Sequence, residues 1–376
     1  MRKVETIVIG GGIAGLSAAA RLARHGETVV LEAEAAPGVH SSGRSVAFSH
    51  FGLGDALVRG LTALSLDALR AAPSDDRPPP AQVHPALHIA RAEEKATLDA
   101  LEAAHREFAD DFERLDGEAA RALVPVLKVG AGGVAHALLH RGALKLDSDA
   151  MLQGHVRDLR AADGELVCNA PVEALRREGG RWIVDTPGAS WSARTVVNAA
   201  GAWTDAVARM AGVAPLGLAP LRRTVIQFCA PEGLDVARWP FTKTVGAGFY
   251  ILPEGGARLL ASAMDEGASE PCDAQAEELD VATAAHRVEQ ATTLTIRHIE
   301  HRWAGLRTFA PDCRPVAGFD PAAEGFFWLA GQGGFGLQTS PAMALAVEAL
   351  ALGLEWPEEF GRFGITAQML TPDRFA

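Results

Sequence analysis

The sequence has little cysteine, no block of basic residues and no long apolar run. Its four cysteines are scattered, with neither a CxxC pair nor a metal-ligand spacing, and this usage favours a reducing cytoplasm. No run of about 18 apolar residues occurs, so no membrane span is predicted. Arg2 and Lys3 precede an apolar stretch, as in a signal peptide, but its glycines are regularly spaced and no small-residue cleavage site follows. We therefore expect a cytoplasmic protein.

Acidic residues outnumber basic ones in the chain as a whole. The formal net charge is −12, from 35 Lys and Arg against 47 Asp and Glu. Such a surface repels phosphate backbones and anionic lipid, so nucleic acid and membrane surfaces are not expected partners. An anionic substrate would need a local cluster of arginines. No His, Asp and Glu cluster indicates a metal site.

The N-terminal segment carries a dinucleotide-binding signature. Gly10, Gly12 and Gly15 fit G-x-G-x-x-G between an apolar strand and a helix. The first glycine permits a tight turn, the second lets a pyrophosphate approach the backbone, and the third lets helix pack on strand. Glu32 ends the next strand, about twenty residues after the turn, where an acid would bind ribose hydroxyls. The motif predicts a dinucleotide cofactor without distinguishing FAD from NAD.

Three further segments favour FAD. The loop 37–45 is rich in Gly and Ser, which suits a cofactor whose body continues past the pyrophosphate. Segment 196–205 is a predicted strand ending in small residues, which let the chain pass close to a cofactor. Segment 326–340 is a predicted strand, a glycine turn and a helix opening near Thr339, with Thr339 or Ser340 as cap. A helix N-terminus there would stabilise negative charge on a reduced flavin.

The remaining chain alternates between helical and strand patterns. Helices are predicted at 55–69, 92–109, 118–123, 147–161 and 279–294, and strands at 170–176, 181–186, 195–198, 222–230, 241–245, 249–252, 258–262, 298–306 and 326–330. The pattern indicates an α/β fold in which a nucleotide-binding domain is interleaved with a substrate domain built on a mostly antiparallel sheet. We expect the FAD-binding domain at 1–85, 145–215 and 300–376, and the substrate domain at 86–144 and 216–299.

These segments resemble the D-amino-acid oxidase (DAO) superfamily of FAD enzymes, most closely its bacterial D-arginine and D-amino-acid dehydrogenase branch. The resemblance covers nearly the whole chain through GGGIAG, PGVHSSGRS, ATTLTIRHIEHRWAGLRTF, RPVAG and GQGGFGLQTS. It implies a glutathione-reductase-type, Rossmann-like FAD domain and a large antiparallel sheet. It also implies hydride transfer from the Cα of a D-amino acid to flavin N5, after which the imine hydrolyses to a 2-oxo acid and ammonia.

The motif and the resemblance together nominate the residues around the cofactor. They are Gly10, Gly12, Ile13, Ala14, Gly15, Glu32, Ala33, His40, Ser41, Ser42, Gly43, Arg44, Ser45, Val172, Ala200, Gly201, Trp203, Gly333, Gly334, Gly336, Leu337, Gln338 and Thr339. Cys313 lies near a region where some flavin amine oxidases attach FAD covalently, but its PDCRP context does not match. Non-covalent FAD is expected.

An amino-acid substrate presents a carboxylate, and a guanidinium is the side chain best matched to it. Arg223 and Arg307 match arginines that hold this carboxylate in the resembling branch. Arg222 lies on the opposite face of the same strand, so the choice between Arg222 and Arg223 stays open. Tyr250, the only tyrosine, matches a residue beside the carboxylate, although a structural role is an alternative.

The sequence departs from that branch at several pocket positions. Ala86 stands where the branch has a glutamate for a guanidinium, which removes the reason to expect arginine as substrate. Leu53 replaces an aromatic hydroxyl of the lid. Phe48 replaces an active-site histidine, and His50, two residues away, could compensate in part.

Two further pocket positions bear on the choice of substrate. Phe241 and Lys243 occupy wall positions, and Lys243 is charged where the relatives are apolar. Lys243 would either accept an acidic side chain or extend to solvent from a strand edge. Gly334 and Gln338 match positions beside both flavin and substrate.

The alternatives keep the fold and change the chemistry. A 2-hydroxy-acid or secondary-amine oxidoreductase, of glycine or sarcosine type, would use the same arginines. A non-catalytic flavin-binding protein is a third possibility, against which Arg223, Arg307 and Tyr250 argue. The electron acceptor, whether oxygen, quinone or another carrier, is not encoded in a motif.

Overall fold

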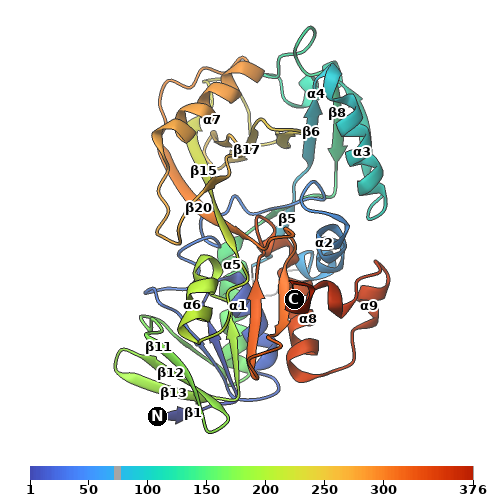
Figure 1. Ribbon diagram of the computed structural model, residues 1–376. Helices are drawn as coiled ribbons and strands as arrows, with labels where there is room; N and C mark the ends of the chain where they lie inside the picture. The colour runs from blue at the N-terminus through green and yellow to red at the C-terminus, as the bar shows by residue number, and fades with distance from the viewer. Residues whose placement is uncertain (72–77, 376) are drawn as a thin grey trace.

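The protein is described by a computed structural model that covers residues 1–71 and 78–375. The chain builds two parts that meet along one side (Figure 1). One part contains both termini and the glycine motif, and the other is organised around a large sheet. The chain crosses between the two parts several times.

The first part is centred on a six-stranded sheet, which is parallel except at one edge. In order, its strands are β10 (Glu165–Val167), β3 (Thr28–Leu31), β2 (Thr6–Ile9), β14 (Thr195–Asn198), β22 (Phe326–Ala330) and the antiparallel β21 (Val316–Phe319). The central strands are buried apolar runs, as expected for a parallel sheet covered on both faces. This arrangement is the nucleotide-binding sheet that the sequence predicts.

Helices cover this sheet and connect it to the second part. They are α1 (Ile13–Leu22), α2 (Ala56–Leu69), α5 (Ser148–Ala161), α6 (Thr204–Met210), α8 (Gly336–Leu352) and α9 (Glu358–Gly361). The alanine-rich α1 packs between α5 and α8, since small side chains allow close helix approach. This part of the molecule also contains a four-stranded sheet. In order, its strands are β1 (Arg2–Lys3), β13 (Ala189–Ala193), β12 (Arg181–Thr186) and β11 (Ala174–Glu178).

The second part is a nine-stranded, mostly antiparallel sheet. Its strands are β19 (Gly267–Ala268), β15 (Ala219–Cys229), β18 (Arg258–Ser262), β17 (Tyr250–Glu254), β16 (Phe241–Thr244), β6 (Ala86–Ala90), β8 (His136–His140) and β7 (Phe112–Asp116), with β20 (His301–Phe309) paired to β15. Only β16 and β6 run parallel. The helices α3 (Lys95–Arg106), α4 (Gly117–Leu123) and α7 (Glu278–Ala291) accompany it. A small sheet of β4 (Phe48–Ser49), β9 (Leu144–Leu146) and β5 (Ala81–Val83) lies near the boundary.

The α/β fold class is confirmed, and several predicted elements are corrected in detail. The strand predicted at 170–176 begins only at Ala174. The helix predicted near Thr339 begins at Gly336, and neither proposed cap residue caps it: Thr339 lies inside the helix and donates to the Phe335 carbonyl. Pairing of β20 with β15 also places residues 301–309 in the large sheet, beyond the predicted boundary at 300.

Candidate functional site

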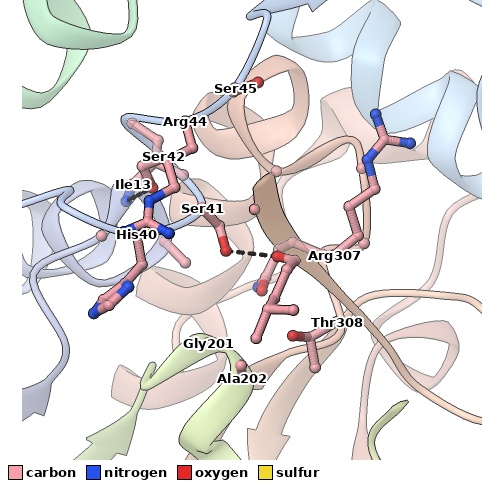
Figure 2. Close-up of a pocket in the computed structure, with 18 of the residues that line it drawn as sticks. Ile13, His40, Ser41, Ser42, Arg44, Ser45, Gly201, Ala202, Arg307 and Thr308 are labelled. Atoms are coloured by element: carbon pink, nitrogen blue, oxygen red, sulfur yellow. Dashed lines mark hydrogen bonds between the residues drawn. The ribbon is translucent and has the colours of Figure 1, made fainter. Parts of the chain in front are cut away.

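A cavity of about 820 Å³ extends from the glycine motif to the large sheet. This is the size of a small-molecule or cofactor site. Figure 2 shows residues of loop 40–45, the turn at 201–202 and the end of β20 around it. Both the nominated cofactor residues and the nominated substrate residues line this one cavity, with four exceptions given below.

At one end, the cavity is lined by the glycine turn and the first residues of α1. Gly10 has φ +109°, and a Cβ on Gly15 would lie 2.0 Å from the Gly10 carbonyl oxygen, so turn and helix can meet only through glycine. The N-cap residue of α1 is Gly12, which has no side chain that could accept a hydrogen bond from the helix amides. The Ile13 amide donates to Ser42 Oγ at 3.0 Å (Figure 2). A helix N-terminus that lines a cavity in this way is a site for a pyrophosphate.

Glu32 lies at the end of β3 beside this turn. Its carboxylate accepts hydrogen bonds from the Gly11 amide at 2.6 Å and the Glu34 amide at 2.9 Å. These bonds fix the carboxylate on the cavity wall and leave each oxygen further acceptor capacity for a ribose hydroxyl.

The loop 40–45 is tied to both parts of the molecule. Ser41 donates to the Leu306 carbonyl at 2.6 Å, so the loop follows β20 (Figure 2). His40 pairs with Glu34 at 2.9 Å and its ring lies 4.7 Å from that of Trp203. Arg44 lines the cavity, but its guanidinium binds backbone carbonyls of the large-sheet part and forms an ion pair with Asp273. The arginine therefore anchors the loop.

The turn before α8 approaches the end of β20 closely. Gly333 has φ +48°, and a Cβ there would lie 2.3 Å from the Phe309 ring. A Cβ on Gly334 would lie 2.8 Å from the Arg307 guanidinium carbon. Glycines in this turn therefore make room for Arg307 beside the start of α8.

Arg223 and Arg307 line the substrate end of the cavity. Arg223 donates to the Asp265 carbonyl at 2.7 Å and pairs with Glu266 at 3.0 Å. Arg307 forms no ion pair with any residue in the part of the chain that the structure describes. Burial, followed by the charge of Arg223, lowers the pKa of Arg307 to about 10, which still leaves it charged at neutral pH. Arg222 points the other way, to Glu277 and Asp280.

Lys243 also lines the cavity rather than extending to solvent. Its Nζ lies 3.4 Å from the Gly52 carbonyl oxygen. Burial and the positive charges of Arg307 and Arg223 lower the pKa of Lys243 to about 8.

Aromatic residues form the wall between these cations and the small sheet. Phe48 stacks on Phe241 with centroids 4.6 Å apart, and Phe241 contacts Tyr250 at 5.4 Å. Tyr250 is 4% exposed, and burial raises the pKa of its phenol. Leu53 lines the same cavity.

His50 is buried at the edge of this wall. Its Nδ1 accepts from the Gly52 amide at 3.0 Å, and its backbone amide donates to Gln338 at 3.3 Å. Gln338 also donates to Thr62 at 2.7 Å, which connects α8 to α2. Burial lowers the pKa of His50 well below its ordinary value, so the ring is neutral at neutral pH.

Four nominated residues do not line the cavity. Gly15 packs the helix against the turn, Gly43 hydrogen-bonds to Gly38, and Thr339 bonds back along α8. Ala86 is fully buried next to Phe241, its register partner across β6 and β16, and does not line the cavity. Several lining residues were not predicted from the sequence. One of them is the charged Glu266, signalled only by an Asp-Glu pair three residues after a predicted strand.

No group of three or more His, Cys, Asp and Glu within residues 1–71 and 78–375 could hold a metal ion. No helix in the same ranges is long and apolar enough to cross a bilayer.

The helix N-terminus at the glycine turn, the carboxylate of Glu32 and the glycine turn before α8 fit a flavin dinucleotide, as in a flavoprotein. A family model described as "FAD dependent oxidoreductase" (DAO) matches residues 5–350. The chain belongs to the DAO family of FAD-dependent oxidoreductases, and its cofactor is FAD.

Known relatives share the fold and differ in substrate. Glycine oxidase of Geobacillus kaustophilus is 28% identical over 199 residues, covering 51% of this chain and 49% of that protein. Its crystal structure has a TM-score of 0.78 at 21% identity, over 97% of this chain and 99% of that one. The sequence match thus spans about half the length of that relative.

Two other solved structures cover almost the whole chain. L-Proline dehydrogenase from P. horikoshii has a TM-score of 0.82 at 19% identity, over 100% of this chain and 98% of that one. L-α-Glycerophosphate oxidase from Mycoplasma pneumoniae, with FAD bound, has a TM-score of 0.81 at 16% identity, over 95% and 96% of the two chains. At these identities the likeness concerns the fold alone.

Proposed function

We propose that this protein oxidises the Cα–N bond of a small amino acid, with a D-amino acid as the leading substrate. The observation that carries the proposal is Arg307, a cation that faces the cavity and has no ion-pair partner among the described residues. An unpaired, largely desolvated charge is costly. A carboxylate matches a guanidinium in charge and geometry, so an amino-acid carboxylate would satisfy it.

The chain's own residues would bind and orient the substrate. Arg307 would hold the carboxylate against Gly334, and Tyr250 would hydrogen-bond to the same group. Arg223, which its ion pair with Glu266 holds in place, would complete the group of cations that it forms with Arg307 and Lys243. In the reaction, the substrate loses a hydride from Cα and a proton from nitrogen, a C=N bond forms, and water converts the imine to a 2-oxo acid and ammonia. FAD, when bound, accepts the hydride.

Glycine or a secondary amine is the second candidate. The sequence similarity to a glycine oxidase favours it, and Arg307 would bind the carboxylate of such a substrate equally well. A 2-hydroxy acid would use the same arginine.

Anaerobic mixing with a substrate panel tests these candidates. The holoenzyme is mixed with D- and L-amino acids, glycine, sarcosine and 2-hydroxy acids, and the absorbance of oxidised flavin is followed. We expect bleaching by amino acids and none by 2-hydroxy acids. Bleaching by hydroxy acids alone, or by no compound in the panel, would refute amino-acid oxidation.

A further inference from the structure

The substrate end of the cavity carries more positive charge than one carboxylate requires. Arg223, Arg307 and Lys243 line it, against the single carboxylate of Glu266. Glu266 is already paired with Arg223 at 3.0 Å, and the Asp265 carboxylate also lies on the Arg223 side, at 4.0 Å. Two cations, Arg307 and Lys243, are therefore left without a carboxylate partner in the described chain.

The strand register places Lys243 in the row of residues that forms the cavity wall. Lys243 is opposite Tyr250 of β17 on one side and opposite His88 of β6 on the other. Residues opposite one another on neighbouring strands have side chains on the same face. The ammonium thus lies on the same face as Tyr250. Its strand β16 is three strand positions from β15, which carries Arg223, and four from β20, which carries Arg307.

The protein supplies little to balance this ammonium. Its one hydrogen-bond acceptor among the described residues is the Gly52 carbonyl, at a long 3.4 Å. The nearby His50 and His88 are neutral, because burial lowers the pKa of each well below its ordinary value. An apolar substrate side chain would seal Lys243 into a drier pocket without a counter-charge, which is unfavourable. A second anionic group on the substrate would remove that cost.

We infer that the pocket selects amino acids with two carboxylates, in which Arg307 binds the carboxylate next to the reacting carbon and Lys243 binds the carboxylate of the side chain. The inference rests on the proposed function for the position of the first carboxylate. Phe48 and Phe241, stacked beside Lys243, would line the methylene groups between the two charges. Acidic amino acids of the aspartate and glutamate type fit this chemistry.

Binding of inert ligands tests the inference without turnover. Glutarate carries two carboxylates and no amine, and glutaramate has the same shape with one carboxylate replaced by an amide. Each is titrated into the holoenzyme, and the perturbation of the visible flavin spectrum gives its Kd. We expect glutarate to bind about 10–100-fold more tightly than glutaramate, the range for a partly desolvated charge pair.

Substitution of the lysine should remove the preference. In Lys243→Met the two ligands should bind within about threefold of each other, whereas Lys243→Arg should retain most of the preference. Lys128→Met, which removes an exposed lysine far from the cavity, is the matched control and should keep the wild-type ratio. If Lys243→Met loses FAD, Lys243→Gln takes its place. Equal affinities in the wild type, or an undiminished preference without the Lys243 charge, would overturn the inference.

The substrate panel separates failure of the inference from failure of the proposed function. If amino acids bleach the flavin and glutarate shows no preference over glutaramate, oxidation of amino acids stands and the dicarboxylate site is refuted. If the glutarate preference holds and no amine reduces the flavin, the dianion site stands and the proposed reaction is refuted.

Discussion

His105 belongs to a group of buried aromatic rings beside the cavity, and its environment predicts a measurable loss of stability in acid. The residue is fully buried, 5.5 Å from His88 and 4.9 Å from Phe112 between ring centroids. Neither ring nitrogen has a hydrogen-bond partner among the described residues. Burial, followed by the charge of His140, lowers the pKa of His105 to about 3.

The direction of the effect follows from proton linkage. An unfolded chain binds the histidine proton near pH 6.5, about 3.5 units above the folded value, so the unfolded state takes up the proton first as pH falls. Stability is therefore complete above about pH 6.5 and is lost on acidification down to about pH 3. At pH 5, one and a half units below the unfolded value, His105 should lower the free energy of unfolding by about 2 kcal/mol.

The assay compares urea unfolding at pH 7.5 and pH 5 in the presence of saturating FAD. His105→Leu should lose about 2 kcal/mol less than the wild type between these two pH values, and any fixed packing cost of the substitution cancels in the difference. His298→Gln, at an exposed histidine, is the control and should follow the wild type. An identical pH dependence in His105→Leu and the wild type would refute the linkage argument.

The site predicts further outcomes. Arg307→Met should cost about 2–5 kcal/mol in kcat/KM for an amino acid. Arg223→Met should cost less, because Glu266 already neutralises Arg223. Near-normal activity in both variants would show that the substrate carboxylate binds elsewhere. Gly12→Val should abolish FAD binding by placing a side chain in the path of the pyrophosphate, measured as flavin absorbance per protein, and a yellow variant would contradict it. Glutarate affinity should fall about tenfold per pH unit above about pH 8, as Lys243 loses its proton, while glutaramate affinity changes little; parallel profiles would contradict it. D-Arginine should be a poor substrate, because the cavity already has unpaired positive charge, and strong flavin reduction by D-arginine would contradict it.

Local sequence signals sufficed for the central strands of the nucleotide-binding sheet, whereas its edge strands β10 and β21 were not predicted. The glycine turn, the apolar strands and Glu32 follow one another closely in the sequence. Their pattern can therefore be recognised within a short stretch of residues. The strands β6, β7 and β8 were not predicted, because Ala86–Ala90 is a short buried run with no alternation and the flanking prolines suggested loop. Such strands are defined by pairing partners distant in sequence.

In the candidate site, too, some features could be predicted from the sequence and others depend on the fold. Arg223 and Lys243 could be nominated from their strands and the family resemblance, but the partner of Arg223 depends on a turn that brings Glu266 back beneath β15. The direction of Lys243 was open in the sequence, since alternation fixes a face only after the register with β6 and β17 is known. The exclusion of Ala86 from the cavity likewise depends on its packing with Phe241 and Tyr250, which lie on strands distant in sequence.

The strand β20 has a consequence for how this enzyme can change its substrate. Its end is fastened to the cofactor side twice: the Leu306 carbonyl accepts from Ser41, and the Thr308 carbonyl accepts from the Gly333 amide at 2.9 Å. Arg307, between these two bonds, is thereby set in position by the loops 40–45 and 331–335, which line the cavity. Within residues 1–71 and 78–375, strand β16 with Lys243 makes no backbone hydrogen bond to the loops 40–45 and 331–335. A library of variants restricted to β16 and the turn 264–266 should therefore yield new substrate ranges while flavin content stays constant, whereas substitutions along the end of β20 should lose cofactor and activity together.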